Sequence, residues 1–251
     1  MKTAVITGAS SGIGQATAHR LDRDGWRLLL VARRPDRLNS LAEELGQATV
    51  LALDLTDPDS PARVRERVEA DFGRLDLLVN NAGAAWRASF GDEEGGYENV
   101  RRTMELNFDA VLRLTEALLP VVRRSAPSAI VNVSSISGRI ALARGGAYSA
   151  SKFALSGWTE SLRFEEAEHG VHVGLVSPGF IATEGFPQSD LMAKPLTRWM
   201  VSTPEKVAEA IVDAGPRRRA ERAVPRAYGL LPPLRALAPR VWSRVARGMR
   251  R

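Results

Sequence analysis

The first eighty residues alternate short apolar runs with amphipathic runs, and this alternation restricts the fold more than any other feature of the sequence. The apolar runs predict buried strands, and the intervals between them carry apolar residues at helical spacing: strands are expected at Thr3–Thr7, Arg27–Ala32, Thr49–Leu53 and Leu75–Asn80, and helices at Ile13–Asp24, Asp36–Leu45 and Pro58–Phe72. Apolar strands that alternate with helices are typical of a parallel sheet covered on both faces, with right-handed crossovers. We therefore expect an α/β protein with a doubly wound parallel sheet.

The remainder of the chain continues the pattern with longer helices. Further helices are predicted at Tyr97–Leu106, Ala110–Arg124, Tyr148–Glu168 and Pro204–Ala214, and further strands at Ala129–Ser134, Val171–Ser177 and Ala223–Tyr228. Gly95-Gly96 is expected to break a helix, and the Pro- and Gly-rich stretch from Pro178 to about Pro195 is long enough to be a mobile lid. A length of 251 residues with 44% hydrophobic content suits one domain, which we place at residues 1–229, followed by a basic amphipathic segment at 230–251.

Charge is distributed unevenly along the chain. The net charge is +6, but the stretch from Pro216 to Arg251 holds 11 arginines and one acid, Glu221, so the remainder carries a net charge of −4. The main body therefore has no reason to bind polyanions, and no nucleic-acid partner is expected.

Several kinds of chemistry are excluded by what the sequence lacks. There is no cysteine, which excludes disulfides, thiol catalysis and cysteine-ligated metals, and the three histidines show no metal-site spacing, so no metal is expected. No apolar run is long enough to span a bilayer, and the first residues pass directly into a strand pattern that leaves no room for a signal peptide. These features predict a cytoplasmic protein.

A glycine-rich turn, Thr7-Gly8-Ala9-Ser10-Ser11-Gly12-Ile13-Gly14, joins the first predicted strand to the first predicted helix. Glycines there allow the backbone to approach a ligand closely, and the helix N-terminus offers N–H groups to a pyrophosphate, as in Rossmann-type dinucleotide sites. Residues 8–12 also match Gly-x-Ser-x-Gly, the nucleophile elbow of serine hydrolases, with His169 or His172 formally available as the base. The hydrolase is the less favoured interpretation, because such short motifs often occur by chance.

The end of the second predicted strand indicates which dinucleotide is favoured. An acid at this place usually holds a ribose 2′-hydroxyl, whereas arginine suits a 2′-phosphate. Here Arg33 and Arg34 follow the strand, and guanidinium groups form bidentate, charge-assisted hydrogen bonds to phosphate, which favours NADP(H) over NAD(H). Two solvated arginines at the start of a helix are the alternative.

Tyr148 and Lys152 stand one helical turn apart near the start of a predicted helix. That spacing places a phenol and an ammonium on one face, where a nearby cation favours the phenolate and allows the pair to donate and recover a proton near neutral pH. A solvated surface pair is the alternative for these two residues taken alone.

Taken together, these segments resemble the short-chain dehydrogenase/reductase family, and the likeness extends to about residue 215. Asn80-Asn81-Ala82-Gly83 is similar to the family segment that closes the fourth strand, and the residues from Pro178 to Thr183 are similar to its nicotinamide-side loop. The resemblance implies a single Rossmann-type domain whose NADP(H) site uses Gly8, Ser10, Ser11, Gly12, Ile13, Gly14, Arg33, Arg34, Asp54, Leu55, Asn81, Ala82, Gly83, Tyr148, Lys152, Pro178, Gly179, Ile181 and Thr183.

The same resemblance implies a catalytic tetrad of Asn107, Ser135, Tyr148 and Lys152 and an oxidoreductase that moves a hydride between a nicotinamide and a carbonyl or secondary alcohol. Tyr148 would transfer the proton, Ser135 would bind the carbonyl oxygen, Lys152 would lower the tyrosine pKa and hold the ribose, and Asn107 would anchor a water that relays protons. Ser134 competes with Ser135, but only Ser135 stands 13 positions before the tyrosine, as in the family. A protein that senses NADP(H) without turning it over is the alternative function.

The sequence departs from the family pattern in three places. Ser11 stands where many NADP-preferring members carry a basic residue, so the preference here depends on Arg33 and Arg34. Gly95-Gly96 interrupts a helix that is usually continuous. The tail beyond residue 215 is not the usual short ending.

Substrate and partners are constrained more weakly. A lipophilic substrate is favoured, because apolar side chains near the lid and in residues 84–90 could line a pocket or belong to the core: Trp86, Phe90, Phe186, Leu191, Met192 and Trp199. The long helices at 110–124 and 148–168 resemble the usual subunit interface of the family, which implies a homodimer or homotetramer. In the tail, an apolar stripe with an arginine-rich face could pack on the body, on a second subunit or on an anionic membrane.

Overall fold

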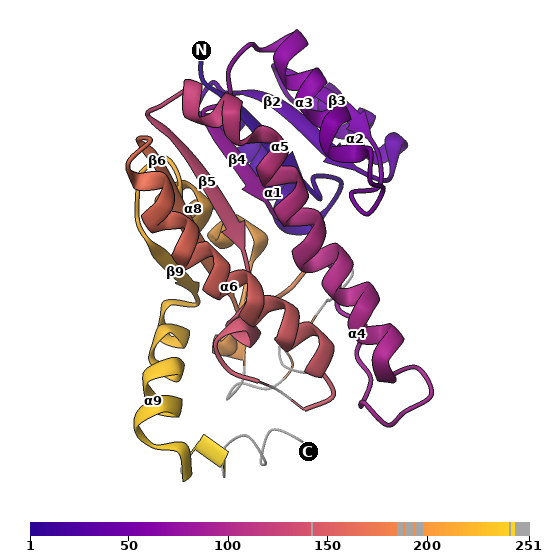
Figure 1. Cartoon of the computed structure of the whole chain (residues 1–251), viewed down its shortest axis with the longest axis vertical. Coiled ribbons are helices and arrows are strands. Elements are labelled where there is room, and N and C mark those ends of the chain that lie inside the picture. Colours follow the sequence, from indigo (N-terminus) through magenta and orange to yellow (C-terminus); the bar gives the residue numbers. More distant parts are fainter. Residues whose placement is uncertain (142, 185–187, 189–192, 194–197, 241, 244–251) are drawn as a thin grey trace.

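The structure is a computed structural model that describes residues 1–141, 143–184, 188, 193, 198–240 and 242–243 (Figure 1). A seven-stranded sheet runs through it in the order β3-β2-β1-β4-β5-β6-β9, and each neighbouring pair is parallel. The strands are β1 (Thr3–Thr7), β2 (Arg27–Ala32), β3 (Ala48–Ala52), β4 (Leu77–Asn80), β5 (Ser128–Val133), β6 (Val171–Pro178) and β9 (Glu221–Val224). The predicted doubly wound parallel sheet is confirmed.

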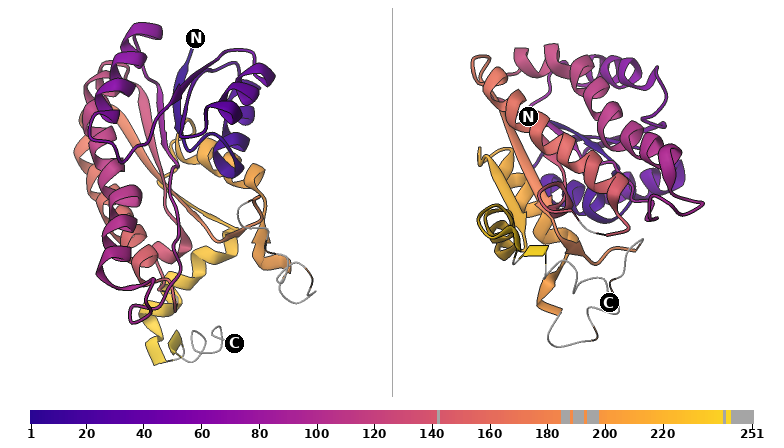
Figure 2. Two further views of the ribbon diagram at one scale, coloured as in Figure 1. Left: turned by 90° about the vertical axis from the view of Figure 1, so that its right-hand side faces the viewer. Right: turned by 60° about the horizontal axis from the view of Figure 1, so that its bottom comes forward.

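Helices cover both faces of the sheet, and Figure 2 shows the two layers on opposite sides. One apolar core joins the sheet to α1 (Gly12–Asp22), α2 (Pro35–Glu44) and α8 (Pro204–Ala214). A second core joins the other face to α3 (Ser60–Asp71), α5 (Ala110–Arg124) and α6 (Gly146–Ala167). The central strands are buried on both faces, which explains why their sequences are continuously apolar instead of alternating.

One long helical rod replaces the two separate helices that the sequence predicts around residue 107. It begins as α4 (Gly96–Met104), passes through a π-helical turn at Glu105–Asp109 and continues into α5 without a break. The turn formed with Gly95 precedes the rod, so the glycine pair starts this helix and does not interrupt it. The expected interruption is therefore wrong, and Asn107 lies inside the π-helical turn.

The C-terminal part also differs from the sequence prediction. The strand expected at Ala223–Tyr228 is observed earlier, as β9, because Pro225 has no N–H to donate to a ladder. A 3₁₀ turn (Arg226–Leu230) and α9 (Leu231–Leu237) follow, and a short parallel pair, β7 (Phe180–Ile181) with β8 (Val201–Ser202), lies beside them in the chain's second, smaller sheet. In the described part of the chain, no helix is long and apolar enough to cross a membrane.

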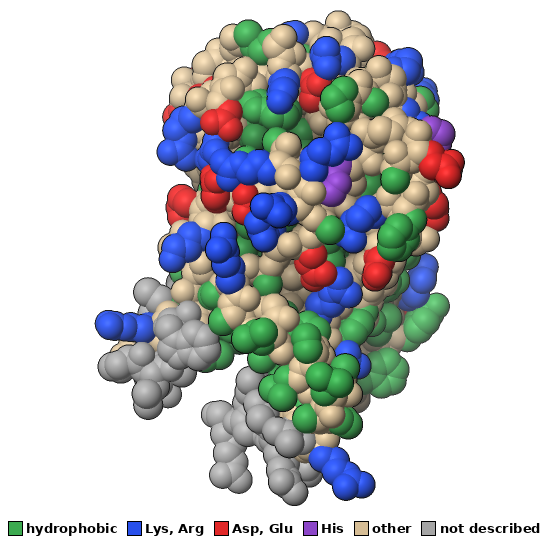
Figure 3. Space-filling model, turned by 90° about the vertical axis from the view of Figure 1, so that its left-hand side faces the viewer, with side chains coloured by type: hydrophobic (Ala, Val, Ile, Leu, Met, Phe, Trp, Pro, Cys, Tyr) green, Lys and Arg blue, Asp and Glu red, His purple; other side chains and the backbone are tan. Residues whose placement is uncertain are grey.

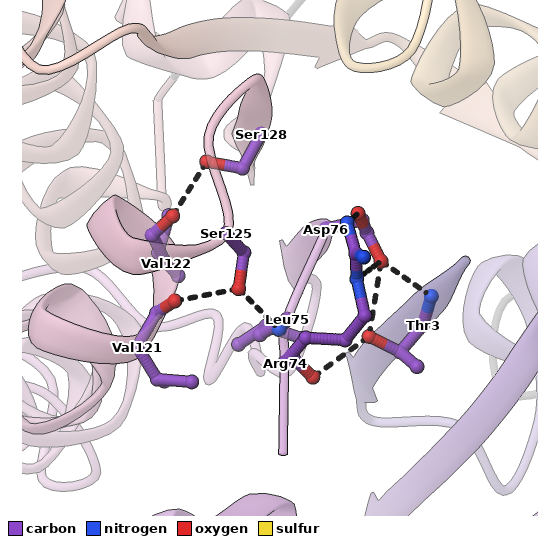
Figure 4. Close-up of polar contacts among 8 residues, drawn as sticks. All are labelled: Thr3, Arg74, Leu75, Asp76, Val121, Val122, Ser125 and Ser128. Carbon is purple, nitrogen blue, oxygen red and sulfur yellow. Dashed lines mark hydrogen bonds and ion pairs between the residues drawn. The ribbon is translucent and has the colours of Figure 1, made fainter. Parts of the chain in front are cut away.

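A buried carboxylate organises the amino-terminal edge of the sheet, far from the glycine turn (Figure 4). Asp76 accepts hydrogen bonds from the Thr3 backbone N–H at 2.8 Å, from the Thr3 hydroxyl at 3.2 Å and from the Arg74 guanidinium at 2.5 and 3.0 Å. The Asp76 side chain is 6% exposed, whereas that of Arg74 is half exposed. This carboxylate therefore ties the first residue of β1 to the start of β4.

Removal of that carboxylate is expected to destabilise the fold. Asp76→Ala leaves the Thr3 N–H buried without its side-chain partner and should lower the free energy of unfolding by about 2–4 kcal/mol, measured by urea denaturation. Glu69→Ala is the matched control, because Glu69 pairs with Arg124 at the surface at 3.4 Å and such a pair contributes less than about 1 kcal/mol. Equal effects of the two substitutions would contradict a structural role for Asp76.

Candidate active site

The glycine turn lines a cleft of about 370 Å³ at the carboxyl ends of β1, β2 and β3. It gathers predicted cofactor residues from loops far apart in the chain: Gly8, Ser10, Ser11, Gly12, Ile13, Arg33, Arg34, Asp54, Leu55, Asn81, Ala82, Gly83 and Thr183. In parallel α/β sheets this edge is where nucleotides bind. The position of the cleft thus agrees with the predicted dinucleotide site.

The backbone around the cleft is shaped to receive a pyrophosphate. A Cβ on Gly14 would lie 2.2 Å from the Gly8 carbonyl oxygen, so only glycine lets α1 begin this close to the end of β1. No side-chain cap is formed at Ser11, which leaves the N–H groups of the first helical turn directed toward the cleft. Thr7 fixes the facing segment, because its hydroxyl accepts hydrogen bonds from the N–H groups of Asn81 at 2.9 Å and Ala82 at 3.0 Å. These residues fit a dinucleotide.

The two arginines after β2 take different positions. Arg34 reaches across the glycine turn and donates to the Ser10 hydroxyl at 3.0 Å and the Ser11 hydroxyl at 2.9 Å. Its guanidinium thereby brings a positive charge to the loop position where the sequence has Ser11 in place of a basic residue. Arg33 lies 3.8 Å from an Asp54 carboxylate oxygen.

The environment of Asp54 keeps it ionised. The backbone N–H of Thr56 holds the pKa of the Asp54 carboxyl below its usual value, with further help from the Thr56 hydroxyl and from Arg33, against the opposing effect of partial burial. The cleft therefore contains two carboxylates near the arginines, Asp54 beside Arg33 and Glu184 near Arg34, at the end that would receive the adenosine.

A second cavity of about 420 Å³ opens from this cleft. The two spaces share Ile13, Asn81, Gly83, Ala84 and Thr183, so a molecule that extends along the cleft would reach the second cavity. Three of the four predicted catalytic residues line this cavity, namely Ser135, Tyr148 and Lys152, together with the predicted loop residues Pro178, Gly179 and Ile181.

The structure separates the two adjacent serines at the end of β5. Ser134 is enclosed by α6, where its hydroxyl lies 2.9 Å from the Ser156 hydroxyl and donates to the Lys152 carbonyl at 3.0 Å. The Ser135 hydroxyl instead donates to the Pro178 carbonyl at 3.3 Å and accepts from the Ser137 N–H at 3.1 Å. Ser134 thus braces the helix that carries Tyr148, and Ser135 is the serine that interacts with the tyrosine hydroxyl.

The carboxyl end of β5 holds the Lys152 side chain in place. Its ammonium donates to the Val133 carbonyl at 2.9 Å and lies 5.9 Å from the centre of the Tyr148 ring, and the side chain is 3% exposed. Burial lowers the pKa of Lys152 to about 8. An ammonium that releases its proton this readily is suited to a proton path.

Asn107 lies next to this group without lining the cavity. Its side chain is clamped to one peptide segment, because its amide oxygen accepts from the Ala84 N–H at 2.9 Å and its amide nitrogen donates to the Ala84 carbonyl at 2.9 Å. The same nitrogen donates to the Ser151 hydroxyl at 3.1 Å, which links the π-helical turn to α6. A Cβ on Gly83 would lie 3.0 Å from Asn107 Oδ1 and 3.4 Å from Lys152 Nζ, so the bare glycine keeps the space between them open.

The pKa of Tyr148 differs from the sequence expectation. Burial raises it, while the hydrogen bond with Ser135 and the positive charge of Arg87 act in the opposite direction. The contributions that lower the Tyr148 pKa thus come from Ser135 and Arg87, whereas the sequence analysis expected Lys152 to lower it. In this state of the protein Tyr148 is a protonated phenol at neutral pH.

The walls of the second cavity are mostly apolar and, apart from Phe180 of the predicted nicotinamide-side loop, come from residues that the sequence analysis did not select. They are contributed by the turn after β5, the β7–β8 pair and the C-terminal segment: Ile136, Ile140, Phe180, Met200, Tyr228 and Leu231. A Cβ on Gly179 would lie 1.8 Å from the Tyr228 ring, so this glycine is what lets the ring pack at the cavity wall. No sequence signal identifies these walls, because only packing brings the segments together.

Two of the aromatic residues expected in the pocket lie elsewhere. Phe90 is 75% exposed, and Trp86 stacks against the Arg102 guanidinium at 4.9 Å; neither is among the cavity residues that the structure describes. Their expected place in the pocket is therefore wrong. Phe186, Leu191 and Met192 lie outside the described residues, as does the side chain of Trp199.

The serine hydrolase alternative is not supported by the geometry. The Ser10 hydroxyl lies at the carboxyl edge of the sheet, where it accepts from Arg34. His169 and His172 lie at the opposite edge, after the end of α6 and near the start of β6, and His172 contacts the Arg219 carbonyl at 3.3 Å. Neither of these two histidines can therefore act as a base for Ser10.

Comparison with known proteins identifies the family of the chain. A family model described as short chain dehydrogenase matches residues 2–193. A solved short-chain dehydrogenase from Streptomyces avermitilis superposes with a TM-score of 0.80 at 34% identity, covering 98% of this chain and 97% of that one. A complex of RhlG with NADP from Pseudomonas aeruginosa gives a TM-score of 0.78 at 27% identity, covering 89% and 94%.

A 3-ketodihydrosphingosine reductase from Bacteroides thetaiotaomicron is 36% identical over 70% of this chain and 62% of its own length. The chain spans between 58% and 62% of the length of several such curated relatives. The family model nevertheless covers about three quarters of the chain, including the cleft and the residues that line both spaces up to Gln188. The chain belongs to the short-chain dehydrogenase/reductase family, whose members are oxidoreductases that use a nicotinamide cofactor.

Proposed function

We propose that the protein is an NADP(H)-dependent oxidoreductase that interconverts a carbonyl and a secondary alcohol on a lipophilic small molecule. The observation that carries this proposal is that Ser135, Tyr148 and Lys152 line one cavity, which opens from the glycine-lined cleft. The bound nicotinamide would supply or accept the hydride, and the protein would supply the proton, the orientation and the electrostatics.

In the reductive direction Tyr148 acts as the general acid. As the carbonyl carbon receives the hydride, its oxygen gains negative charge and takes the phenolic proton, which yields the alcohol and a tyrosinate. Ser135 donates a hydrogen bond to the same oxygen and stabilises the charge that develops in the transition state. For this donation the Ser135 hydroxyl must leave the Pro178 carbonyl, which it contacts at a long 3.3 Å.

Lys152 and Asn107 support the return of the proton. The Lys152 ammonium, with its pKa of about 8, stabilises the tyrosinate and can pass a proton toward it. Asn107 holds the Ala84 segment and Ser151 in place beside Lys152 and thereby keeps the space in which a relaying water would sit. Lys152 would also hold the ribose hydroxyls of a bound cofactor.

The preference for NADP(H) is proposed to depend on Arg33 and Arg34. The double substitution Arg33→Glu/Arg34→Glu should lower the ratio of kcat/KM for NADPH over NADH by about 100-fold or more, because charge-assisted hydrogen bonds to the 2′-phosphate are replaced by repulsion. Steady-state rates with each cofactor measure the ratio.

Arg65→Glu is the matched control for this experiment, since Arg65 is an exposed arginine of α3 outside the cleft. It should leave the cofactor ratio unchanged. A ratio that is also unchanged in the double variant would mean that the phosphate is bound elsewhere.

The substrate class follows from the apolar walls of the cavity, which favour a lipophilic ketone, aldehyde or secondary alcohol. The similarity to a protein named 3-ketodihydrosphingosine reductase is consistent with a long-chain substrate. A panel of aliphatic, acyl and cyclic carbonyls and alcohols, followed by NADPH absorbance with NADH in parallel, tests the proposal. Binding of NADPH without turnover of any compound would instead favour the sensor.

The chain is further proposed to form a homodimer or homotetramer through α5 and α6. These helices are joined to each other by a bidentate ion pair between Arg123 and the buried Glu166, and α6 presents Phe164 with 69% of its surface exposed. A rigid helical pair with an exposed aromatic residue is suited to self-association. Light scattering of the purified chain, with a monomer mass of 27.3 kDa, measures the state.

A further inference from the structure

The segment that closes the substrate cavity has a second apolar face directed at solvent. On its inner side Tyr228 and Leu231 line the cavity, and Trp242 packs with them and with Ile136 in a small core. On its outer side Leu230, Leu234 and Leu237 are 72%, 39% and 86% exposed. The outer leucines are spaced at i, i+4 and i+7, so they form one stripe along the helix.

These three residues, here called the leucine stripe, belong to a larger apolar area. Figure 3 shows hydrophobic side chains gathered at the end of the molecule that carries α9. Leu230 and Leu237 are among the most exposed large apolar residues in the described part of the chain. A contiguous exposed apolar area on a helix indicates an interaction surface, whereas single exposed residues do not.

The positive charge around the leucine stripe indicates which kind of partner this surface can bind. Residues 226–251 contain seven arginines and no lysine or acid. Among the described ones, Arg226 and Arg240 are exposed, while Arg235 donates to the Arg139 carbonyl at 3.0 Å and stacks on Phe153 at 5.3 Å. A partner for this surface must therefore be both apolar and anionic.

A second copy of the chain satisfies this requirement poorly. In a twofold contact the same face meets itself, so the arginines would oppose one another with no acid of the segment between them. An anionic phospholipid bilayer offers phosphate groups to the arginines and an acyl boundary to the leucines.

We propose that the leucine stripe docks the protein on an anionic phospholipid bilayer, with Arg226 and Arg240 at the level of the lipid phosphates. The helix would lie in the plane of the interface, as amphipathic surface helices do, without crossing the membrane. Leu231, which follows Leu230 in the chain and lines the cavity, would then place the wall of the substrate cavity next to the lipid. That last consequence rests on the proposed function, whereas the docking itself does not.

The test measures binding separately from catalysis. The intact protein is mixed with vesicles of phosphatidylcholine containing phosphatidylglycerol, or of phosphatidylcholine alone, and the bound fraction is determined by flotation. We expect the protein to bind the anionic vesicles. Binding should be weaker in high salt, because salt screens the attraction between the arginines and the lipid phosphates. The triple variant Leu230→Ser/Leu234→Ser/Leu237→Ser should have a partition coefficient at least about tenfold lower than that of the unaltered protein.

Two further variants control the experiment. Leu237→Ser alone removes the most exposed leucine at the end of α9 and should lower binding, whereas Phe90→Ser removes a similarly exposed apolar side chain far from α9 and should not. Unchanged thermal unfolding and NADPH affinity of each variant show that the fold is intact.

The proposal is overturned if the unaltered protein does not float with anionic vesicles or if the leucine variants bind them as well as it does. It is also overturned if the substitutions change the mass in solution and not vesicle binding, since the stripe would then be a contact between copies. Loss of turnover in a Tyr148 variant with vesicle binding intact would leave the docking proposal in place, so the two proposals fail independently.

Discussion

Replacing Tyr148 with phenylalanine is expected to lower kcat for carbonyl reduction by about a thousandfold, because the substitution removes the phenolic hydroxyl that interacts with Ser135 and would supply the proton. Tyr228 also lines the cavity, but its hydroxyl already donates a hydrogen bond to the Met200 carbonyl at 2.9 Å, so it is not expected to replace Tyr148 as the proton donor. NADPH affinity should be nearly unchanged, because the aromatic ring keeps its volume. Single-turnover absorbance and a fluorescence titration with NADPH measure the two quantities separately.

Tyr97→Phe is the matched control, since this tyrosine lies on α4 and is 67% exposed. It should retain full turnover. Normal turnover in the Tyr148 variant would contradict the proposed mechanism, and an equal loss in both variants would mean that the substitutions act through the fold.

The pH dependence of the unaltered enzyme follows from the same group. Burial keeps Tyr148 protonated at neutral pH, so kcat/KM for reduction should be level near pH 7 and should decline above about pH 8, as Lys152 loses its proton. Oxidation requires a tyrosine that can accept a proton, so its rate should rise over the same range. Because the two groups interact, the profiles report the pair and not either residue alone.

Replacing Lys152 with methionine is expected to abolish turnover and to stabilise the protein. The ammonium is 3% exposed, and its pKa is lowered from 10.5 to about 8, which corresponds to a cost of about 3 kcal/mol for holding the charge in the folded state at neutral pH. Loss of the hydrogen bond to the Val133 carbonyl offsets about 1 kcal/mol of the gain. Lys152→Met should therefore be more stable by about 2 kcal/mol at pH 7, or roughly 4–8 °C in Tm.

This gain should depend on pH in a defined direction. Below about pH 8 the lysine is protonated in both the folded and the unfolded protein, so the cost of the buried charge is fully present. Between about pH 8 and 10.5 the folded protein releases its proton first, and the unaltered protein gains stability relative to the variant. The difference in Tm should therefore shrink as the pH rises through this range.

Lys206→Met serves as the control, because Lys206 is an exposed lysine of α8 and should show neither the gain nor its pH dependence. A Lys152 variant that is less stable at pH 7 would mean that the ammonium stabilises the fold and that its environment is not destabilising. A buried ammonium that lowers the stability of the fold is typical of active sites, where function is often retained at the expense of stability.

Much of the architecture could be predicted because its signals are local. Strands β1, β2 and β4 are buried almost throughout, and continuous apolar runs predict that state without knowledge of the rest of the chain. The spacing of Tyr148 and Lys152 likewise requires only the geometry of one helix. Errors arose where a local signal was ambiguous, as at Gly95-Gly96, since glycines that can break a helix can equally precede its first turn.

The sequence by itself predicted the parallel sheet and the glycine turn, because each follows from periodicity or composition within one or two elements, whereas the proposed catalytic set of Asn107, Ser135, Tyr148 and Lys152 came from the resemblance to the family. Only the tertiary structure decided that Arg34 covers Ser11, that Ser134 faces α6 and that Tyr228 and Leu231 wall the cavity. Each of these contacts joins residues that are 18 or more positions apart, and no local pattern encodes which distant side chains will meet. Packing of the helices and the C-terminal segment against the sheet selects those contacts, and with them the space that a substrate can occupy.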